Sequence, residues 1–289
     1  MNSLPKISVV TITYGHQDYI TETLDGVFMQ QYDGPIEFII ANDNSPDNTD
    51  EVIKGYLATR QIPANFEVKY TKHSKNLGMI PNFKWALGQA EGKYIAFCEG
   101  DDYWSEVSKL SKQVECLEKN EDIACCGCYV TIERFGKMDE PVKSYNEEES
   151  SLKNLVFKLP FPTLTMMLRK KYIENFINYN VRFGDVDLFM YIGQFGKFQK
   201  LPFIGGVYRF HGKGVVSGGN RSKLLKGILE AKIQANSTLS LHLECGIRKQ
   251  LRRQFFNEIK SLRFFYRSDF DLKNSLILIW FCVKKYFSI

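Results

Sequence analysis

Two adjacent carboxylates, Asp101 and Asp102, stand close after a short apolar segment of the chain, from which Glu99 and Gly100 separate them. Residues 94–98 (Tyr-Ile-Ala-Phe-Cys) carry apolar or aromatic side chains at every position, which predicts a buried strand. Neighbouring carboxylates repel each other and are costly to desolvate, and a hard cation such as Mg²⁺ or Mn²⁺ removes that cost. The pattern predicts metal-assisted phosphate chemistry, but Asp-Asp after a strand is also typical of a solvated turn.

A further carboxylate, Asp185, precedes a segment with helical periodicity. Leu188, Ile192 and Phe195 fall on one helical face, which predicts a helix that begins near Asp185. Asp185 or Asp187 could cap that helix. The same carboxylate could take a proton from an attacking hydroxyl as a general base, and the two roles are compatible.

A basic segment follows at residues 207–217. Arg209, His211 and Lys213 alternate at the two-residue period of an extended chain, so their side chains share one side. Cations beside a diphosphate would stabilise the charge that develops on a leaving group. His211 could also complete a metal's ligand set, although a single histidine is more often structural.

The elements that position these residues alternate between strands and helices. Strands are predicted at residues 7–14, 36–41, 67–70, 94–98, 123–132 and 163–168. Helical apolar periods separate the first four strands. This alternation predicts an α/β fold with a mostly parallel sheet and helices on both of its faces.

Polar loops follow these strands, and ligands of open α/β sheets bind outside the carboxyl ends of the strands. Asp43, directly after the second strand, could accept a hydrogen bond from a ribose hydroxyl or a base N–H. The chain has neither a Gly-x-Gly-x-x-Gly motif after the first strand nor a P-loop motif. A dinucleotide dehydrogenase and a P-loop NTPase are therefore disfavoured, and phosphate must be held by metal and side chains.

Four motifs in this order resemble those of the family-2 glycosyltransferases with the GT-A (Rossmann-like) fold, over about residues 6–215. The motifs are Thr13-Tyr14-Gly15-His16, the segment 42–49, Asn76-Leu77-Gly78 with Asn82, and Glu91-Gly92-Lys93-Tyr94-Ile95 leading to Asp101-Asp102. The resemblance implies transfer of a sugar from a nucleotide diphosphate donor, usually UDP-linked, with inversion at the anomeric carbon. It also implies an acceptor hydroxyl on a glycan or a lipid-linked sugar.

The resemblance also implies roles for single residues. The nucleotide-binding residues would be Thr13, Tyr14, Asp43, Asn76, Asp101 and Arg209. Asp102 would be the direct ligand of Mg²⁺ or Mn²⁺, with His211 as a second ligand. Asp185 would be the general base, and Asp187 is the alternative for that role.

Composition and charge divide the chain into two parts. With 289 residues, 44% hydrophobic and 25% charged, it is typical of a soluble globular protein. Residues 221–289 hold 14 Lys/Arg and 5 Asp/Glu, a net charge of +9, whereas residues 1–220 carry a net charge of −4. We expect a GT-A domain over 1–220 and a basic, amphipathic helical extension over 221–289 that could contact an anionic membrane.

Cysteine usage and hydropathy predict the compartment. Seven cysteines at irregular spacing favour reduced, apolar strand residues over a zinc site. Neither a leader peptide nor an apolar run long enough to span a bilayer is predicted. We therefore expect a cytoplasmic protein, at the inner face of the plasma membrane if the extension binds lipid. No nucleic-acid-binding module accompanies the basic extension.

Two other hypotheses remain open from the sequence. A nucleotidyltransferase that makes sugar nucleotides would share the sheet type, but would need a glycine-rich basic loop after the first strand, where Thr13-Tyr14-Gly15-His16 stands. A non-catalytic binding module of a membrane-associated complex would not need Asp43, Asp102 and Asp185 together. The three carboxylates favour the enzyme.

Overall fold

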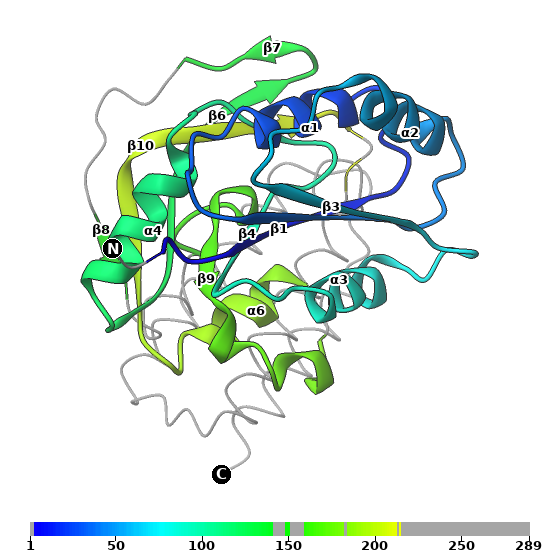
Figure 1. Cartoon of the computed structure of the whole chain (residues 1–289). Coiled ribbons are helices and arrows are strands. Elements are labelled where there is room, and N and C mark those ends of the chain that lie inside the picture. Colours follow the sequence, from blue (N-terminus) through cyan, green and yellow to red (C-terminus); the bar gives the residue numbers. More distant parts are fainter. Residues whose placement is uncertain (1–2, 141–147, 151–158, 182–183, 213, 215–289) are drawn as a thin grey trace, which may run out of the picture.

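The structure is a computed structural model that describes residues 3–140, 148–150, 159–181, 184–212 and 214. One ten-stranded sheet runs through the molecule (Figure 1), with a main strand order of β3-β2-β1-β4-β9-β6-β10-β5. The strands are β1 (Ile7–Thr13), β2 (Ile36–Asn42), β3 (Phe66–Lys72), β4 (Tyr94–Phe97), β5 (Tyr103–Trp104), β6 (Ile123–Arg134), β7 (Lys137–Met138), β8 (Glu148–Ser150), β9 (Met167–Arg169) and β10 (Lys197–Phe210). The α-helices are α1 (Ile20–Phe28), α2 (Thr49–Thr59), α3 (Met79–Gly88), α4 (Lys109–Lys119) and α6 (Asp185–Ile192).

The amino-terminal half forms the expected parallel array. β1 pairs in parallel with β2 and β4, and β2 pairs in parallel with β3. The helices between these strands return the chain across the sheet, so that consecutive strands keep one direction. The α/β fold with a mainly parallel sheet is confirmed, and the carboxyl ends of β1 to β4 meet at one edge.

The second half departs from the parallel pattern at β9. The sequence predicts one strand over residues 163–168, but Thr163–Thr165 is a 3₁₀ turn and β9 begins only at Met167. The turn is closed by Thr165, whose amide and hydroxyl both donate to the Pro162 carbonyl, at 3.0 and 2.9 Å. The remaining three-residue strand lies antiparallel between β4 and β6, so it joins the two halves of the sheet.

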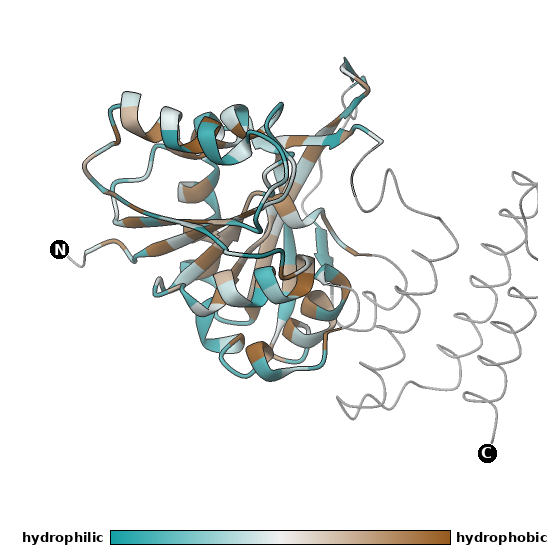
Figure 2. Ribbon diagram, turned by 90° about the vertical axis from the view of Figure 1, so that its right-hand side faces the viewer, coloured by the Kyte–Doolittle hydropathy of each residue, from teal (hydrophilic) through white to brown (hydrophobic). Residues whose placement is uncertain are grey.

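Alternating side chains of the strands build a separate apolar core on each face of the sheet. Val10, Ile39 and Phe97 pack on the face covered by α3 and α6. Val9 and Phe38, one residue away along their strands, pack on the face covered by α1 and α4. Figure 2 shows these strands as apolar (brown) in the interior and the outer helix faces as polar (teal). Because both faces are covered, the ligand site must lie at an edge.

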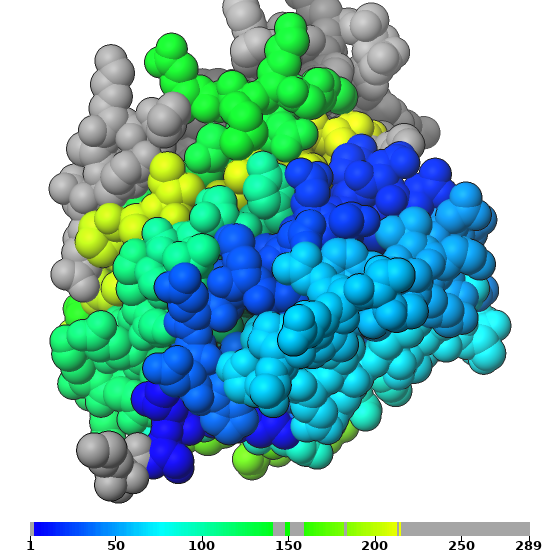
Figure 3. All heavy atoms as spheres, turned by 45° about the horizontal axis from the view of Figure 1, so that its top comes forward, coloured from blue at the N-terminus to red at the C-terminus, as the bar shows by residue number. Residues whose placement is uncertain are grey.

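Figure 3 shows one surface of the molecule, where the blue amino-terminal part of the chain adjoins β10 (yellow) and the β6–β7 hairpin (green). Among the described residues, no helix combines the length and hydropathy needed to cross a bilayer. The predicted extension at residues 221–289 lies outside the described residues, as does Lys213.

Candidate functional site

The loops after β1 and β2 are tied together by backbone amides at the carboxyl edge of the sheet. Gly15 adopts a φ of +74°, a left-handed conformation that favours glycine. Its amide donates to Ser45 Oγ at 3.0 Å, and the next amide, that of His16, donates to Thr49 Oγ1 at 2.9 Å. The polar residues of the segment 42–49 thus position the chain that leaves Thr13.

Asp43 links the same region to the loop after β3. Its amide donates to the Thr13 carbonyl at 2.9 Å. Its two carboxylate oxygens accept from the amides of Leu77 and Gly78, at 2.6 and 2.9 Å. Asn76 Oδ1 also accepts from the Gly78 amide, at 2.8 Å. The structure therefore brings together three of the residues expected to bind the nucleotide, and Asp43 also organises the loop that carries Asn76.

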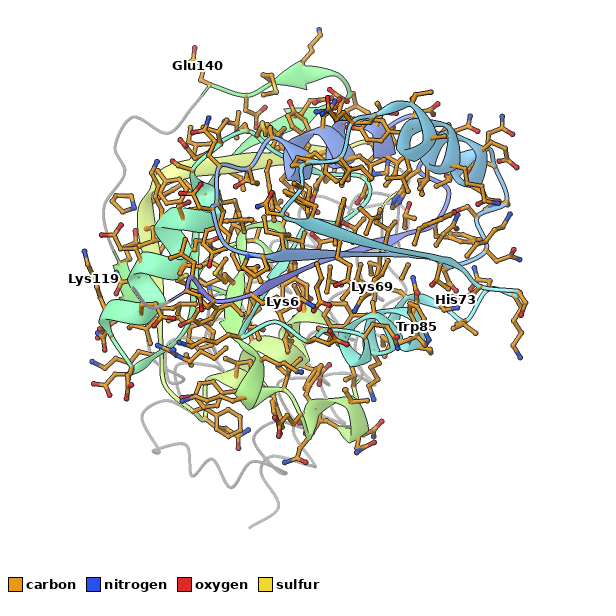
Figure 4. All side chains as sticks on the ribbon, viewed as in Figure 1. Lys6, Lys69, His73, Trp85, Lys119 and Glu140 are labelled. Atoms are coloured by element: carbon orange, nitrogen blue, oxygen red, sulfur yellow. The ribbon has the colours of Figure 1, made fainter. Side chains whose placement is uncertain are left out.

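Contacts of the Asn82 side chain hold the start of α3 next to the loop after β3. Asn82 Nδ2 donates to the Ala41 carbonyl at 3.1 Å, while its Oδ1 lies 2.9 Å from His73 Nε2. His73 in turn packs edge-on against Trp85, with ring centroids 4.7 Å apart (Figure 4).

Tyr14, also expected in the nucleotide pocket, is 47% exposed and leaves an aromatic face available to solvent or a ligand.

Asp101 lies between two histidines. Its Oδ2 is 3.1 Å from His211 Nε2 and 3.8 Å from His16 Nε2. Burial opposes ionisation of Asp101, but the contact with His211 and the charge of His16 hold its pKa below the usual range. The histidines therefore favour an ionised Asp101 at neutral pH.

Asp102 has the opposite electrostatic environment. Its Oδ1 accepts the Arg209 amide at 2.7 Å, and its own carbonyl accepts the Thr23 hydroxyl at 2.6 Å. Burial and the neighbouring charges of Asp101 and Glu99 raise its pKa well above the ordinary value of 3.8. A cation bound beside Asp102 would reverse this shift, since it favours the ionised form.

Arg209 holds this acidic turn in place with its side chain. The guanidinium is 4% exposed and forms ion pairs with Glu22 and, at 3.4 Å, with Glu133. Nη1 donates to the Asp101 carbonyl at 3.2 Å, and the group lies 4.4 Å from the centroid of the Tyr103 ring. These contacts, together with the amide bond to Asp102, join β10 to the carboxyl end of β4.

Asp185 is the first residue of α6, one residue after the expected capping position. Gly184 precedes the helix with a φ of +51°. Asp185 Oδ1 accepts the Val186 amide at 2.8 Å, and Oδ2 accepts the Thr163 hydroxyl at 3.1 Å. Burial raises the pKa of Asp185, which makes it a better proton acceptor near neutral pH than an exposed aspartate. Asp187, the alternative base, is 0% exposed.

Sequence reasoning missed two residues of the site, His16 and Glu99. His16 follows Tyr14-Gly15 in a recognised motif, so its position in the loop after β1 was the available signal. Glu99 stands two residues before Asp101 at the end of the same predicted strand. Burial and the charges of Asp101 and Asp185 raise its pKa to about 8.

The chemistry of the acidic edge fits a hard divalent cation. Within the described ranges, no three His, Cys, Asp or Glu side chains converge as a ready-made metal site. Asp102 nevertheless gives a buried carboxylate whose pKa is raised by burial and by the charges of Asp101 and Glu99, and Asp101 adds a second carboxylate beside it. Mg²⁺ is commonly held by one or two carboxylates while substrate phosphates and water complete its shell.

Comparison with known proteins defines the class. Residues 8–176 match the family described as Glycosyl transferase family 2, and the chain belongs to that family. The match ends before Asp185, Arg209 and His211. The roles expected for these three residues therefore depend on the structure and on the resemblance seen in the sequence motifs. The fold is that of the GT-A glycosyltransferases.

Two relatives by sequence and one by structure are similar to this chain. An uncharacterised protein of Mycobacterium bovis is 34% identical over 214 residues, which cover 72% of this chain and 60% of that protein. A putative teichuronic acid biosynthesis glycosyltransferase of Bacillus subtilis, TuaG, is 34% identical over 114 residues, 39% of this chain and 42% of its own. The crystal structure of S. aureus TarS 1-349 in complex with UDP-GlcNAc has a TM-score of 0.69 at 18% identity, and covers 93% of this chain and 77% of that one. The chain thus spans about 60% of the length of the first curated relatives it matches.

Proposed function

We propose that the protein is an inverting, metal-dependent glycosyltransferase that moves a sugar from a UDP-sugar donor to a hydroxyl of a glycan or lipid-linked acceptor in surface polysaccharide synthesis. The proposal is supported mainly by one observation: two groups of side chains lie next to each other at one edge of the sheet. The Thr13–Asp43–Asn76 loops lie on one side, and the Asp101–Asp102 turn follows the neighbouring strand. The bond from the Gly100 amide to the Ile12 carbonyl, 3.0 Å long, connects the two groups directly.

The donor assignment is supported by chemistry and by similarity. The carboxylate of Asp43 and the ring of Tyr14 offer a hydrogen-bond acceptor and a stacking surface for a base and its ribose. TarS, which shares the fold, is described in complex with UDP-GlcNAc. TuaG, a relative by sequence, is named for teichuronic acid biosynthesis, which supports a polysaccharide product. The TarS complex favours UDP as the nucleotide of the donor.

In the proposed reaction, Asp185 takes the proton of the acceptor hydroxyl as its oxygen attacks the anomeric carbon of the donor sugar. The bond from that carbon to the diphosphate breaks on the opposite face, so the configuration inverts and UDP leaves. A Mg²⁺ or Mn²⁺ ion held by Asp102, with Asp101 and His211 beside it, would neutralise charge on the departing diphosphate when bound. The Thr163 hydroxyl and the Val186 amide hold the Asp185 carboxylate in position at the start of α6.

Titration calorimetry of UDP, GDP, CDP and dTDP, each with and without Mn²⁺, tests the donor site. We expect UDP to bind best, with an affinity that depends on Mn²⁺ and is lost in Asp43→Ala and Asp102→Ala. Preference for another diphosphate would contradict the UDP assignment. Failure of all four to bind would contradict the enzyme and favour the binding module, and release of pyrophosphate from UTP and a sugar phosphate would favour a nucleotidyltransferase.

We also propose that residues 221–289, which lie outside the described residues, contact an anionic membrane at the cytoplasmic face. Their net charge of +9 and the apolar segment 276–283 support this proposal. Deletion of residues 273–289 should move the protein from the membrane fraction to the soluble fraction. Unchanged fractionation of a folded truncated protein would contradict it.

A further inference from the structure

The β6–β7 hairpin ends in an unusual turn. Arg134 pairs with Lys137 across the hairpin, so Phe135 and Gly136 form the two-residue connection. Their φ angles, +48° and +78°, are both positive, as in a type I′ turn. Asn or Asp followed by glycine is typical at these two positions, because a bulky side chain is strained at a positive φ. Phe135 therefore adopts a backbone conformation that is unfavourable for its side chain.

Phe135 is also the most exposed of the large hydrophobic side chains that the structure describes, at 71%. Its ring packs edge-on against Phe210, with centroids 5.8 Å apart, and its amide donates to the Phe210 carbonyl at 3.0 Å. Met138, three residues further on, is 53% exposed. Figure 1 shows this hairpin (β7) at the outer margin of the described chain, beyond α1 and α2. Folding gains little from these two apolar side chains, because most of their surface stays in water.

The two basic residues of the turn add a third unfavourable feature. Arg134 and Lys137 are directly opposite each other, and like charges in that arrangement destabilise a hairpin. Arg134 Nε donates to Asp139 Oδ2 at 2.9 Å, and its guanidinium lies 5.3 Å from the centroid of the Phe210 ring. Asp139 stands further back along the hairpin, since its amide donates to the Ile132 carbonyl at 2.7 Å. The outermost residues therefore combine an apolar ring with two cations.

Features that lower the stability of the free protein are retained where a function needs them. The small size of the tip restricts its partner. A stable protein interface takes roughly 20–30 residues from each side, and the tip consists only of residues 134–138. β7, with 2 residues, also offers too few backbone groups for a strand of another chain to add to it. A lipid surface needs no such area, because an aromatic ring enters the apolar boundary while neighbouring cations stay at the phosphate headgroups.

We propose that the tip of the β6–β7 hairpin binds the surface of an anionic membrane, with Phe135 inserted at the headgroup boundary and Arg134 and Lys137 at the lipid phosphates. This inference goes beyond the membrane contact proposed for residues 221–289, because it concerns a different part of the chain. The tip is joined to the acidic edge through β10. The residue after Phe210 is His211, whose Nε2 lies 3.1 Å from Asp101 Oδ2. Binding at the tip therefore holds the proposed site near the membrane that would carry a lipid-linked acceptor.

Vesicle binding tests the inference. The full chain would be sedimented with vesicles of phosphatidylcholine and phosphatidylglycerol in equal parts. Phe135→Asn removes the ring and introduces a residue that tolerates a positive φ. We expect it to bind vesicles about 10-fold more weakly than the wild type, and Lys137→Gln to bind about fivefold more weakly. Val107→Asn, at an exposed apolar residue in the loop before α4, is the matched control and should bind as the wild type does.

A fluorescent side chain at the tip tests insertion directly. In Phe135→Trp, brominated phosphatidylcholine in the vesicles should quench the emission more strongly than it quenches the three native tryptophans of the wild type. This variant keeps an aromatic ring, so it decides the question even if Phe135→Asn proves unstable. Equal quenching in the variant and the wild type would overturn the inference, as would wild-type vesicle binding by a folded Phe135→Asn.

Further measurements on Phe135→Asn identify other partners. Loss of self-association in sedimentation velocity without lipid, together with unchanged vesicle binding, would assign the tip to a second copy of the chain and overturn the inference. A raised KM for a soluble acceptor, again with unchanged vesicle binding, would assign it to the acceptor and also overturn the inference. A wild-type protein that binds UDP while Phe135→Trp does not insert would overturn this inference alone. Insertion of Phe135→Trp without binding of any nucleotide by the wild type would overturn the proposed function alone.

Discussion

Buried acids at the two ends of the parallel strands have opposite electrostatic environments. At the amino ends, Glu37 of β2 has a fully buried side chain whose oxygens accept from the Ser8 hydroxyl, from the Glu91 amide and, at 3.0 Å, from the Gly92 amide. Lys69 Nζ lies 2.8 Å from Glu37 Oε2, and Lys6 Nζ lies 3.2 Å from it (Figure 4 labels both lysines). At the carboxyl ends, neighbouring acids raise the pKa values of Asp102 and Glu99.

This difference appears directly in the pKa values. Burial disfavours the ionised form of Glu37, but the hydrogen bonds and the lysines lower its pKa to about 2. Burial and like charges raise the pKa of Glu99 to about 8. Glu37 has hydrogen-bond and charge partners within the protein, whereas Glu99 Oε2 has no hydrogen-bond partner among the described residues. The comparison teaches that burial alone does not identify a functional acid; the presence or absence of partners does.

The largest effect on catalysis should come from the acidic edge. Asp185→Asn removes the proposed general base and should lower kcat by about 10²- to 10⁴-fold, the usual contribution of such a group. The amide retains an oxygen for the Val186 amide, so the helix start should persist. Steady-state kinetics with UDP-sugar and acceptor, and circular dichroism of the same preparation, check both expectations.

The matched variant for Asp185→Asn is Asp25→Asn, which removes a half-exposed carboxylate from α1 that pairs with Arg60. It should leave kcat unchanged. Wild-type activity in Asp185→Asn would remove Asp185 from the mechanism. The same substitution at Asp187 would then test the alternative base.

The largest effect on stability should come from the amino ends. Glu37→Ala leaves the buried Ser8 hydroxyl and the Glu91 amide without the acceptor that Glu37 provides, and it removes one partner of each of two lysines. Breaking a buried charged network from one side typically costs about 3–5 kcal/mol of unfolding free energy. Urea unfolding monitored by fluorescence measures it. A loss below about 1 kcal/mol would contradict the structural role of Glu37.

Sequence reasoning recovered the first four strands, and it did so for a physical reason. Strands buried on both faces must be apolar throughout, so the segments around Val9, Phe38 and Ile95 are recognisable from composition alone. The carboxyl ends of parallel strands also share an edge by topology. Asp43 and Asp101 could thus be placed together without coordinates.

The parts that could not be predicted depend on contacts between distant residues. Asp102 and the Arg209 amide are 107 positions apart, and nothing local to either residue indicates their bond. The 3₁₀ turn at Thr163–Thr165 is closed by a threonine side chain within an otherwise strand-like run. Glu37 and Glu99 each stand in a strand-like segment, so only the tertiary partners distinguish them.

The pH dependence of the unfolding free energy tests the lowered pKa of Glu37. The folded pKa of Glu37 is lowered from an ordinary 4.5 to about 2, so its contribution is fully present above pH 4.5 and is lost as the pH falls toward 2. The difference amounts to about 3 kcal/mol of unfolding free energy. We therefore expect the stability difference between wild type and Glu37→Gln to shrink between pH 5 and pH 2, measured by urea unfolding at each pH. A constant difference over that range would contradict a lowered pKa.

The smallest predicted effect comes from removing one hydrogen bond of the Glu37 network and leaving the others in place. Ser8 Oγ accepts the Gly92 amide at 2.8 Å and donates to Glu37, and the residue is fully buried. Ser8→Ala should cost about 1–3 kcal/mol, because one donor to the carboxylate is lost while the Gly92 amide still reaches Glu37. Thr59→Ala, which removes an exposed hydroxyl bonded to the Gly55 carbonyl, is the matched control for a hydroxyl outside the network. If Ser8→Ala lowered the unfolding free energy as much as Glu37→Ala, Glu37 would depend on Ser8 alone. The number of partners would then not explain the difference between Glu37 and Glu99.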